Sequence, residues 1–240
     1  MQLTGGNEKV NDKSIVENKT VIGKNEQGNI SASLSYISKF NISESSKILD
    51  VGCGYGSLIY NLQQRGYNKV YAIDINKNKI LKGKSDYPEI AENLIFYNGE
   101  IIPYDDNYFD VILMFDVIEH IPKINNFLAE QVYRVLKNNG QFIFQTPNKN
   151  INVPWSILYN KSFSRWRQHH CSLQTKTTLL SLLWHSGFKD IVIERYNIIT
   201  PHNLRKVRAK LGYMGVLMLH LFQRMPLALY PNLWGYGIKK

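Results

Sequence analysis

The sequence predicts an α/β fold built on a doubly wound, mostly parallel sheet of seven strands with helices on both faces. Two observations predict it. Short apolar runs alternate along the chain with amphipathic stretches, which is typical of parallel strands joined by crossover helices. A glycine-rich turn also follows the first of these runs, where folds of this kind bind their ligands.

The elements are expected in a regular order. Apolar residues at helical spacing predict a first helix at 30–40. Buried strands follow at 47–51, 69–75, 93–97, 109–115 and 141–145. The helices between them are expected at 57–65, 76–84 and 127–137, the last ended by Asn138-Asn139-Gly140. A sixth unit has a helix at 176–186, capped by Gly187, and a strand at 191–196; residues 233–240 return as a seventh strand at the sheet edge.

Charge is distributed unevenly along the chain, whose net charge is +10. Residues 1–130 hold 13 Lys and Arg against 17 Asp and Glu, a balance of −4. Residues 131–240 hold 16 against 2, a balance of +14. This asymmetry indicates an anionic partner for the C-terminal half, such as a phosphate-bearing small molecule, nucleic acid or acidic lipid. A lysine-rich composition throughout is the alternative explanation.

The sequence features that bear on location favour the cytoplasm. Two cysteines, Cys53 and Cys171, are too few for a disulfide framework. The first residues lack the apolar run of a signal peptide. No apolar stretch approaches the roughly 18 to 20 residues of a membrane-spanning helix.

The glycine-rich turn lies between the strand that ends at Val51 and the next helix. Its glycines allow a tight turn and let a ligand lie against the backbone, and the helix start offers unpaired N–H groups. They are Gly52, Gly54 and Gly56. Ser57 stands where the dinucleotide fingerprint would have its third glycine, so the spacing argues against a nicotinamide cofactor.

Two carboxylates accompany the turn. Asp50 precedes the first glycine, where it can hold an ammonium group, and Asp74 ends the second strand, where it can accept both hydroxyls of a ribose. A nicotinamide dinucleotide has no ammonium group at that position, whereas S-adenosylmethionine does. The pair, in this order on consecutive strands, therefore favours S-adenosylmethionine.

Further motifs extend the pattern: Ile102-Pro103-Tyr104, Phe109-Asp110-Val111, the segment from Asp116 to Pro122, Arg134-Val135-Leu136-Lys137 and Thr146-Pro147-Asn148. With them, residues 30–196 resemble the class I, Rossmann-like S-adenosylmethionine-dependent methyltransferases, in particular the ubiquinone-biosynthesis enzymes and the type 11 and 23 methyltransferase domains. The resemblance implies the class I methyltransferase fold, S-adenosylmethionine as cofactor and methyl transfer as the activity.

The resemblance also implies contacts along the whole cofactor. Asp50 and the three glycines would hold the methionine end, and Phe115 and Asp116 would line the sulfonium. The ribose and adenine would lie against residues that follow the second and third strands: Asp74, Ile75, Asn98, Gly99 and Glu100. Relatives often carry an aspartate where Asn98 stands, but an amide oxygen can still accept a hydrogen bond from the adenine amine.

The candidate catalytic residues are His120 and Glu119. They follow the fourth strand, where doubly wound folds have their ligand crevice, and a histidine can take a proton near neutral pH. A sulfonium methyl is already activated, so positioning supplies most of the catalysis, while an oxygen acceptor must also lose a proton. The alternative is that both residues only cap and orient the next helix.

The same segment resembles the metal-binding pattern of the ubiquinone-biosynthesis O-methyltransferases and the small-RNA 3′-end 2′-O-methyltransferases. The resemblance implies that Asp116, Glu119, His120 and either His169 or His170 hold a divalent ion that activates a hydroxyl. However, Asp116 stands where the RNA enzymes have a glutamate, and Glu-His is common in relatives without a metal. No metal is therefore expected.

One domain is expected at 29–240, after a flexible N-terminal tail at 1–28. It comprises a cofactor half at about 29–148, an acceptor loop at about 149–175 and a helical insertion at about 198–231. The helix at 30–40 should pack over the cofactor. The loop carries aromatic and basic residues that suit stacking on a base or sugar, or form a hydrophobic lid: Trp155, Tyr159, Phe163, Arg165, Trp166, Arg167, His169 and His170.

The insertion joins a basic segment to an apolar one. Arg205, Lys206, Arg208 and Lys210 precede an apolar run between Leu211 and Leu221. Residues 203–224 are therefore expected to lie on a membrane surface or to cover the substrate, with a core helix as the alternative.

Together these features predict O-methylation of a small-molecule, glycan or lipid-linked acceptor that is anionic or membrane-associated. The protein would work in the cytoplasm or at the inner membrane surface. An RNA methyltransferase, with nucleic acid as partner, is the second hypothesis. A non-catalytic methyltransferase-like binding subunit is the third, and the intact glycine turn argues against it. The oligomeric state is not predicted.

Overall fold

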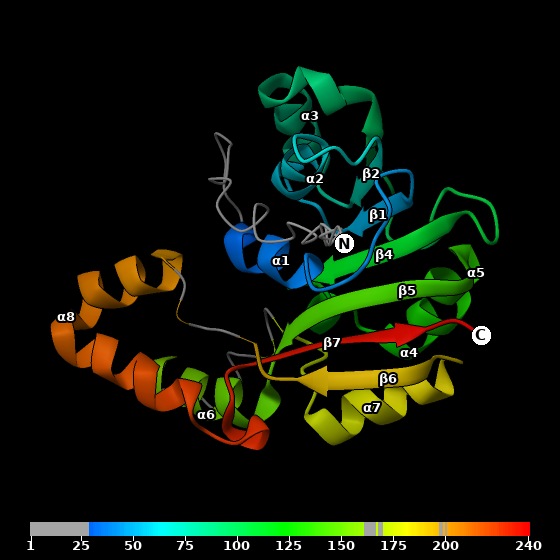
Figure 1. Cartoon of the computed structure of the whole chain (residues 1–240). Helices are drawn as coiled ribbons and strands as arrows, with labels where there is room; N and C mark the ends of the chain where they lie inside the picture. The colour runs from blue at the N-terminus through cyan, green and yellow to red at the C-terminus, as the bar shows by residue number, and fades with distance from the viewer. Residues whose placement is uncertain (1–28, 161–166, 168–169, 197–198, 200) are drawn as a thin grey trace, which may run out of the picture.

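The computed structural model describes residues 29–160, 167, 170–196, 199 and 201–240. They form a seven-stranded sheet in the order β3-β2-β1-β4-β5-β7-β6 (Figure 1). The strands are β1 (Lys47–Val51), β2 (Lys69–Asp74), β3 (Leu94–Phe96), β4 (Phe109–Phe115), β5 (Leu136–Pro147), β6 (Lys189–Glu194) and β7 (Asn232–Ile238). β1 to β5 run parallel to one another, which confirms the expected doubly wound sheet.

Helices cover both faces of the sheet (Figure 1). One face carries α1 (Ile30–Ile37), α2 (Ser57–Gln63) and α3 (Lys77–Asp86). The other carries α4 (Ile124–Asn126), a π-helical turn (Phe127–Val132), α5 (Tyr133–Val135) and α7 (Lys176–His185). The remaining helices, α6 (Lys149–Asn160) and α8 (Pro201–Gln223), lie beyond the carboxyl ends of the parallel strands (Figure 1).

The core consists of two layers, because successive side chains of a strand point to opposite faces. Ile48 of β1 and Val111 of β4 pack under α1 and α2, whereas Leu49 and Ile112 pack under α4 and α7. The central strands are therefore apolar on both faces, as buried parallel strands must be. This explains why they read as continuous apolar runs in the sequence.

The sequence predicted that the last strand lies at the edge of the sheet, and this was wrong. β7 runs antiparallel between β5 and β6, and β6 is the edge strand. Gly235 allows β7 to fit between β5 and β6. A Cβ at this position would lie 2.3 Å from the Val192 carbonyl oxygen and 2.7 Å from Cζ of Phe144. A glycine inside a strand often marks such an approach.

Two predicted boundaries near β5 were also wrong. The helix expected to reach Lys137 ends at Val135, and β5 already begins at Leu136, which pairs with Phe109. Asn139 does not end a helix; it lies inside β5 with φ +61° and donates its N–H to the Lys239 carbonyl oxygen. Pairing with β4 and β7 thus overrides the local helix-stop signal.

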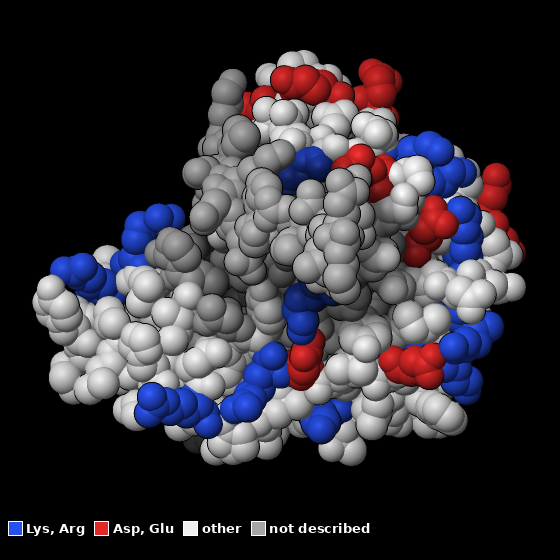
Figure 2. Space-filling view, in the orientation of Figure 1, with Lys and Arg blue, Asp and Glu red and all other residues white. Residues whose placement is uncertain are grey.

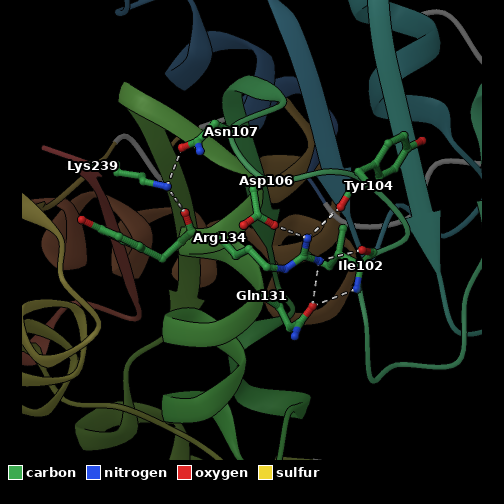
Figure 3. Close-up of polar contacts among 8 residues, drawn as sticks. Ile102, Tyr104, Asp106, Asn107, Gln131, Arg134 and Lys239 are labelled. Carbon is green, nitrogen blue, oxygen red and sulfur yellow. Dashed lines mark hydrogen bonds and ion pairs between the residues drawn. The ribbon is translucent and has the colours of Figure 1, made fainter.

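A polar network ties the segment before β4 to α5, at the end of the sheet opposite the glycine turn (Figure 3). Arg134 donates to the carbonyl oxygens of Ile102 and Tyr104, each at 2.8 to 2.9 Å, and pairs with Asp106 at 2.9 Å. Lys239 donates to Asn107 Oδ1 at 2.9 Å. These bonds hold the start of β4 and so help to set where its other end lies.

Between β6 and β7 the chain forms the expected helical insertion. α8 consists of two helical arms that meet at Gly212, where φ is +59° and ψ is −149°. A short 3₁₀ helix, Leu227–Leu229, then leads into β7. Among the residues that the structure describes, no helix has the length and apolar character needed to cross a bilayer.

Candidate active site

The glycine turn leads from β1 directly into α2. Gly52, Gly54 and Gly56 have φ values of +79°, +59° and +81°, a region that glycine occupies at little cost. A Cβ on Gly52 would come within 2.4 Å of the Val117 side chain. Glycine is therefore required there both by the backbone conformation and by the close approach of the segment after β4.

Asp74 holds this turn in place. One carboxylate oxygen accepts a hydrogen bond from the Gly54 N–H at 2.7 Å, and the other accepts from the Asn76 N–H at 2.7 Å. Each oxygen keeps a lone pair for a further donor, so the expected ribose contact remains compatible with this geometry. The contact itself stays a prediction.

A pocket, called here the main pocket, opens beside the glycine turn at the carboxyl ends of β1 and β4. Its walls come from α1, the turn, the start of α2 and the segment after β4. They consist of Asn29, Ile30, Ser33, Asp50, Gly52, Cys53, Ser57, Leu58, Phe115, Asp116 and His120. The structure thus brings together five of the predicted site residues, and α1 lies against the pocket as expected.

The other predicted cofactor residues do not line this pocket in the described part of the chain. Gly54 and Gly56 lie within the turn, and Asp74 supports it from behind. Ile75 has an exposed side chain after β2. Asn98 to Glu100 form an exposed turn after β3, where the Asn98 amide oxygen accepts from the Glu100 N–H. Their expected contacts with ribose and adenine stay predictions.

Asp50 is the buried charge of the main pocket. Burial raises the pKa of its carboxyl well above the ordinary value, and the neighbouring Asp74 raises it further. A buried carboxylate is costly unless a cation neutralises it. Together with the glycine turn, this donor set fits a ligand that carries an ammonium group.

Asp116 occupies a strained position at the end of β4. Its φ is +55°, a left-handed conformation that costs a non-glycine residue on the order of 1–3 kcal/mol. Its N–H donates to the Gln145 carbonyl oxygen at 3.1 Å, which helps to hold the conformation. Strain of this kind concentrates at functional sites, and here it keeps Asp116 in the pocket wall.

Glu119 and His120 lie on a 3₁₀ turn, Ile118–His120, which Val117 separates from Asp116. The Glu119 carboxylate is buried and accepts a hydrogen bond from the Thr146 hydroxyl at 2.9 Å. Burial, with a smaller contribution from Asp116, raises the pKa of Glu119 to about 8. His120 is half-exposed, and its Nε2 lies 3.8 Å from Glu119 Oε1. The buried Glu119 thus lies beside the imidazole of His120, and His120 itself lines the pocket.

His170 completes a group with these two residues. Its ring centroid lies 5.1 Å from that of His120. Glu119, His120 and His170 each offer one ligand atom, and these atoms lie within 4.8 Å of one another. Two imidazoles and a carboxylate suit a transition metal or zinc. These residues could therefore hold a cation, and the expectation that none is used stays untested.

A second pocket joins the main one at Asn29, Ser33 and Asp116. Its walls come from α1, α8 and the ends of β5 and β7. They consist of Asn29, Ala32, Ser33, Asp116, Gln145, Asn203, Asn232 and Trp234. Apart from Asp116, none of these residues was predicted as a site residue from the sequence. Gln145, a polar residue ending an apolar strand, was the one local signal; the others depend on where α8 and β7 lie.

The predicted aromatic and basic cluster falls largely outside the described residues. This applies to Phe163, Arg165, Trp166 and His169, and to the side chain of Tyr159. Within the described part, Trp155 is exposed on α6 and Arg167 is exposed as well. His170 joins the site, because its ring lies against that of His120.

The fold and site define a class I, Rossmann-like methyltransferase, with a glycine turn and two acidic strand ends at the carboxyl edge of the sheet. The chain belongs to the methyltransferase domain family, whose model matches residues 22–193. Family and fold together confirm the expected class of enzyme and its cofactor, S-adenosylmethionine.

Similar proteins include several methyltransferases. A demethylmenaquinone methyltransferase of Staphylococcus epidermidis is 26% identical over 182 residues, covering 67% of this chain and 75% of the relative. A mitochondrial ubiquinone biosynthesis O-methyltransferase of Dictyostelium discoideum is 30% identical over 122 residues, covering 44% of this chain and 36% of the relative. An uncharacterized protein of Methanocaldococcus jannaschii is 30% identical and covers 58% of this chain. The match spans 56% of that protein, about half its length.

Solved structures share the fold. An S-adenosylmethionine-dependent methyltransferase from Mesorhizobium loti superposes with a TM-score of 0.59, covering 82% of this chain and 94% of the other at 16% identity. One from Archaeoglobus fulgidus gives a TM-score of 0.56, covering 85% and 90% at 18% identity. At these identities the likeness shows the architecture and leaves the acceptor open.

Proposed function

We propose that this protein transfers a methyl group from S-adenosylmethionine to a hydroxyl oxygen of a small-molecule, glycan or lipid-linked acceptor held in the second pocket. The observation that carries the proposal is the junction of the two pockets at Asn29, Ser33 and Asp116. A cofactor in the main pocket and an acceptor in the second would meet there. Proximity of this kind supplies most of the catalysis of a displacement.

The walls of the second pocket favour a hydroxylated ring. Asn203, Gln145 and Asn232 each offer an amide that can donate and accept hydrogen bonds, and Trp234 offers an aromatic face. Among the described wall residues none is Lys or Arg. An anionic group on the acceptor would therefore lie outside this pocket, toward the basic part of the C-terminal half.

The proposed chemistry divides between the cofactor and the protein. When bound, S-adenosylmethionine supplies a methyl group on a positively charged sulfur, whose C–S bond breaks as the new C–O bond forms. Asp50 neutralises the ammonium group. The His120 imidazole accepts the proton that the acceptor hydroxyl loses, and the buried Glu119, whose Oε1 lies 3.8 Å from His120 Nε2, orients the ring. Asp116 forms part of the junction, and Phe115 lines the main pocket beside it.

The names of relatives support a small-molecule or lipid-linked acceptor. The names of similar proteins include ubiquinone biosynthesis O-methyltransferases and ubiquinone/menaquinone biosynthesis C-methyltransferases. His120 at the pocket supplies the base that a hydroxyl acceptor needs. We also propose that the enzyme works in the cytoplasm, which its two free cysteines support.

The proposal is tested with the full chain and isotope-labelled S-adenosylmethionine. Panels of catechols, quinols, hydroxylated glycans, amines and structured RNA are compared as acceptors. We expect label to move to a hydroxyl oxygen, located by mass spectrometry. Binding of the cofactor without transfer to any hydroxyl compound, combined with transfer to amines or RNA, would overturn the proposal.

A further inference from the structure

α8 forms a helical hairpin that projects from the body of the protein (Figure 1). Its arms meet at Gly212, whose φ and ψ are accessible only to glycine. At Gly215 the second arm touches the first, because a Cβ there would lie 2.5 Å from Val207 and 2.6 Å from Leu211. The hairpin is thus a packed unit, called here the α8 hairpin (residues 201–223).

The second arm turns its apolar side outward. Tyr213, Leu217 and Leu221 recur every four residues and lie on one helix face, with Met214 and Met218 beside them. These five side chains are between 41% and 77% exposed. Gly215, on the opposite face, is buried. A contiguous apolar strip that points away from the protein marks an interaction surface.

Positively charged residues occur in the same segment as this strip. Residues 195–240 contain no Asp or Glu. Exposed cations stand at Arg205, Arg208, Lys210 and Arg224. The Arg208 guanidinium lies 4.8 Å from the Tyr213 ring centroid and donates to the Tyr213 hydroxyl at 2.9 Å, so charge and strip adjoin. On the side seen in Figure 2, the end of the molecule formed by α8 carries blue but no red atoms.

We propose that the outer face of the α8 hairpin docks on the surface of an anionic lipid bilayer. The apolar strip would enter the interface between headgroups and acyl chains, while the cations meet the lipid phosphates. A second copy of the chain fits the surface less well. A symmetric dimer would face this patch with itself, and the segment has no acidic side chain to pair with the opposing cations.

Docking would also orient the second pocket. Asn203 belongs to the first arm of the hairpin and lines that pocket. The pocket would therefore open close to the headgroups, within reach of a lipid-linked acceptor. The docking itself does not depend on methyl transfer and is measured without any acceptor.

The test is sedimentation of the full-length protein with vesicles of phosphatidylcholine alone, or with phosphatidylglycerol added. The test variant is Leu217→Glu/Leu221→Glu. The control is Leu81→Glu on α3, whose side chain is 56% exposed against 54% for Leu217. We expect binding to the anionic vesicles that weakens with salt, and a loss of at least about tenfold in the test variant only.

Circular dichroism and S-adenosylmethionine binding verify that each variant is folded. Absence of binding to anionic vesicles by the wild-type chain would overturn the proposal, and so would equal binding to both vesicle types. A third overturning result is a dimer, seen by light scattering, that the test variant dissociates. Retention of vesicle binding by the folded test variant would also overturn the proposal.

Discussion

Asp50 and Glu119 are both buried carboxylates at the carboxyl edge of the sheet, yet their surroundings differ. Asp50 lines the main pocket beside Asp74, and none of the described pocket residues is Lys or Arg. Glu119 accepts a hydrogen bond from the Thr146 hydroxyl, and its Oε1 lies 3.8 Å from His120 Nε2. The surroundings of Asp50 favour binding of a positively charged ligand, whereas those of Glu119 favour the protonated carboxyl. We therefore expect Asp50 to affect ligand binding and Glu119 to affect the pH dependence of stability.

Asp50→Asn should weaken the binding of S-adenosylmethionine by about tenfold to a hundredfold, because an amide cannot neutralise the ammonium group. Isothermal titration measures the dissociation constant. Asp105→Asn, an exposed carboxylate away from the pocket, is the matched control. An unchanged affinity in Asp50→Asn would show that the ammonium group binds elsewhere.

Glu119 should make the protein less stable as pH rises. Its pKa is about 8 in the folded chain against an ordinary 4.5, so the folded state holds a proton that the unfolded state releases. The stabilisation is complete below pH 4.5 and is lost as pH rises through 8.

Urea unfolding between pH 5 and 8 measures this loss, which should be on the order of a few kcal/mol. Glu119→Gln keeps an acceptor for Thr146 but cannot titrate. Its free energy of unfolding should therefore decline less over this range. Parallel curves for the two proteins would contradict the assignment.

His120→Ala should lower kcat by about 10²- to 10⁴-fold while S-adenosylmethionine binds as before, because the residue takes a proton and does not hold the cofactor. Steady-state kinetics and titration separate the two effects. His185→Ala, on α7, serves as control. A matching loss of cofactor affinity would assign His120 a structural role, the alternative left open by the sequence.

At the scale of elements, β7 shows how a strand is placed by its neighbours. Gly235→Ala should destabilise the protein by about 1–3 kcal/mol, because a Cβ would lie 2.3 Å from the Val192 carbonyl oxygen and 2.7 Å from Phe144. Gly237→Ala on the same strand should cost less, since its Cβ would lie 3.2 Å from Phe188 Cβ. Urea unfolding compares the two variants, and equal losses would mean that β5 and β6 can move apart.

The same scale explains which boundaries could be predicted. Strands β1, β2 and β4 were located well because they are apolar on both faces and their turns carry glycine or polar residues. The start of β5 was missed, because Asn138-Asn139-Gly140 reads locally as a helix stop. In the fold, Asn139 instead bonds to Lys239, about one hundred residues away in the chain. Local signals carry no information about such a partner.

At the scale of the whole molecule, the second pocket depends on segments that are distant in sequence. Asn203→Ala in α8 should raise the KM for the acceptor by about tenfold and leave S-adenosylmethionine affinity unchanged. Initial-rate kinetics with a hydroxylated acceptor test this, and Asn68→Ala, an exposed asparagine before β2, is the control. A shift in cofactor affinity alone would place the acceptor elsewhere.

The sequence by itself determined the class of fold, the glycine turn, Asp50 and the segment from Asp116 to His120, because these features are local. The hydrophobic period locates the strands, and residue spacing together with the resemblance to class I methyltransferases locates the turn and the motifs. Only the tertiary structure decided that Asp74 clamps the turn through Gly54, that β7 lies inside the sheet, and that α1, α8 and β7 build a second pocket. Each of these depends on contacts between residues far apart in the chain. Such contacts are chosen by packing and backbone pairing in three dimensions, which no local pattern encodes.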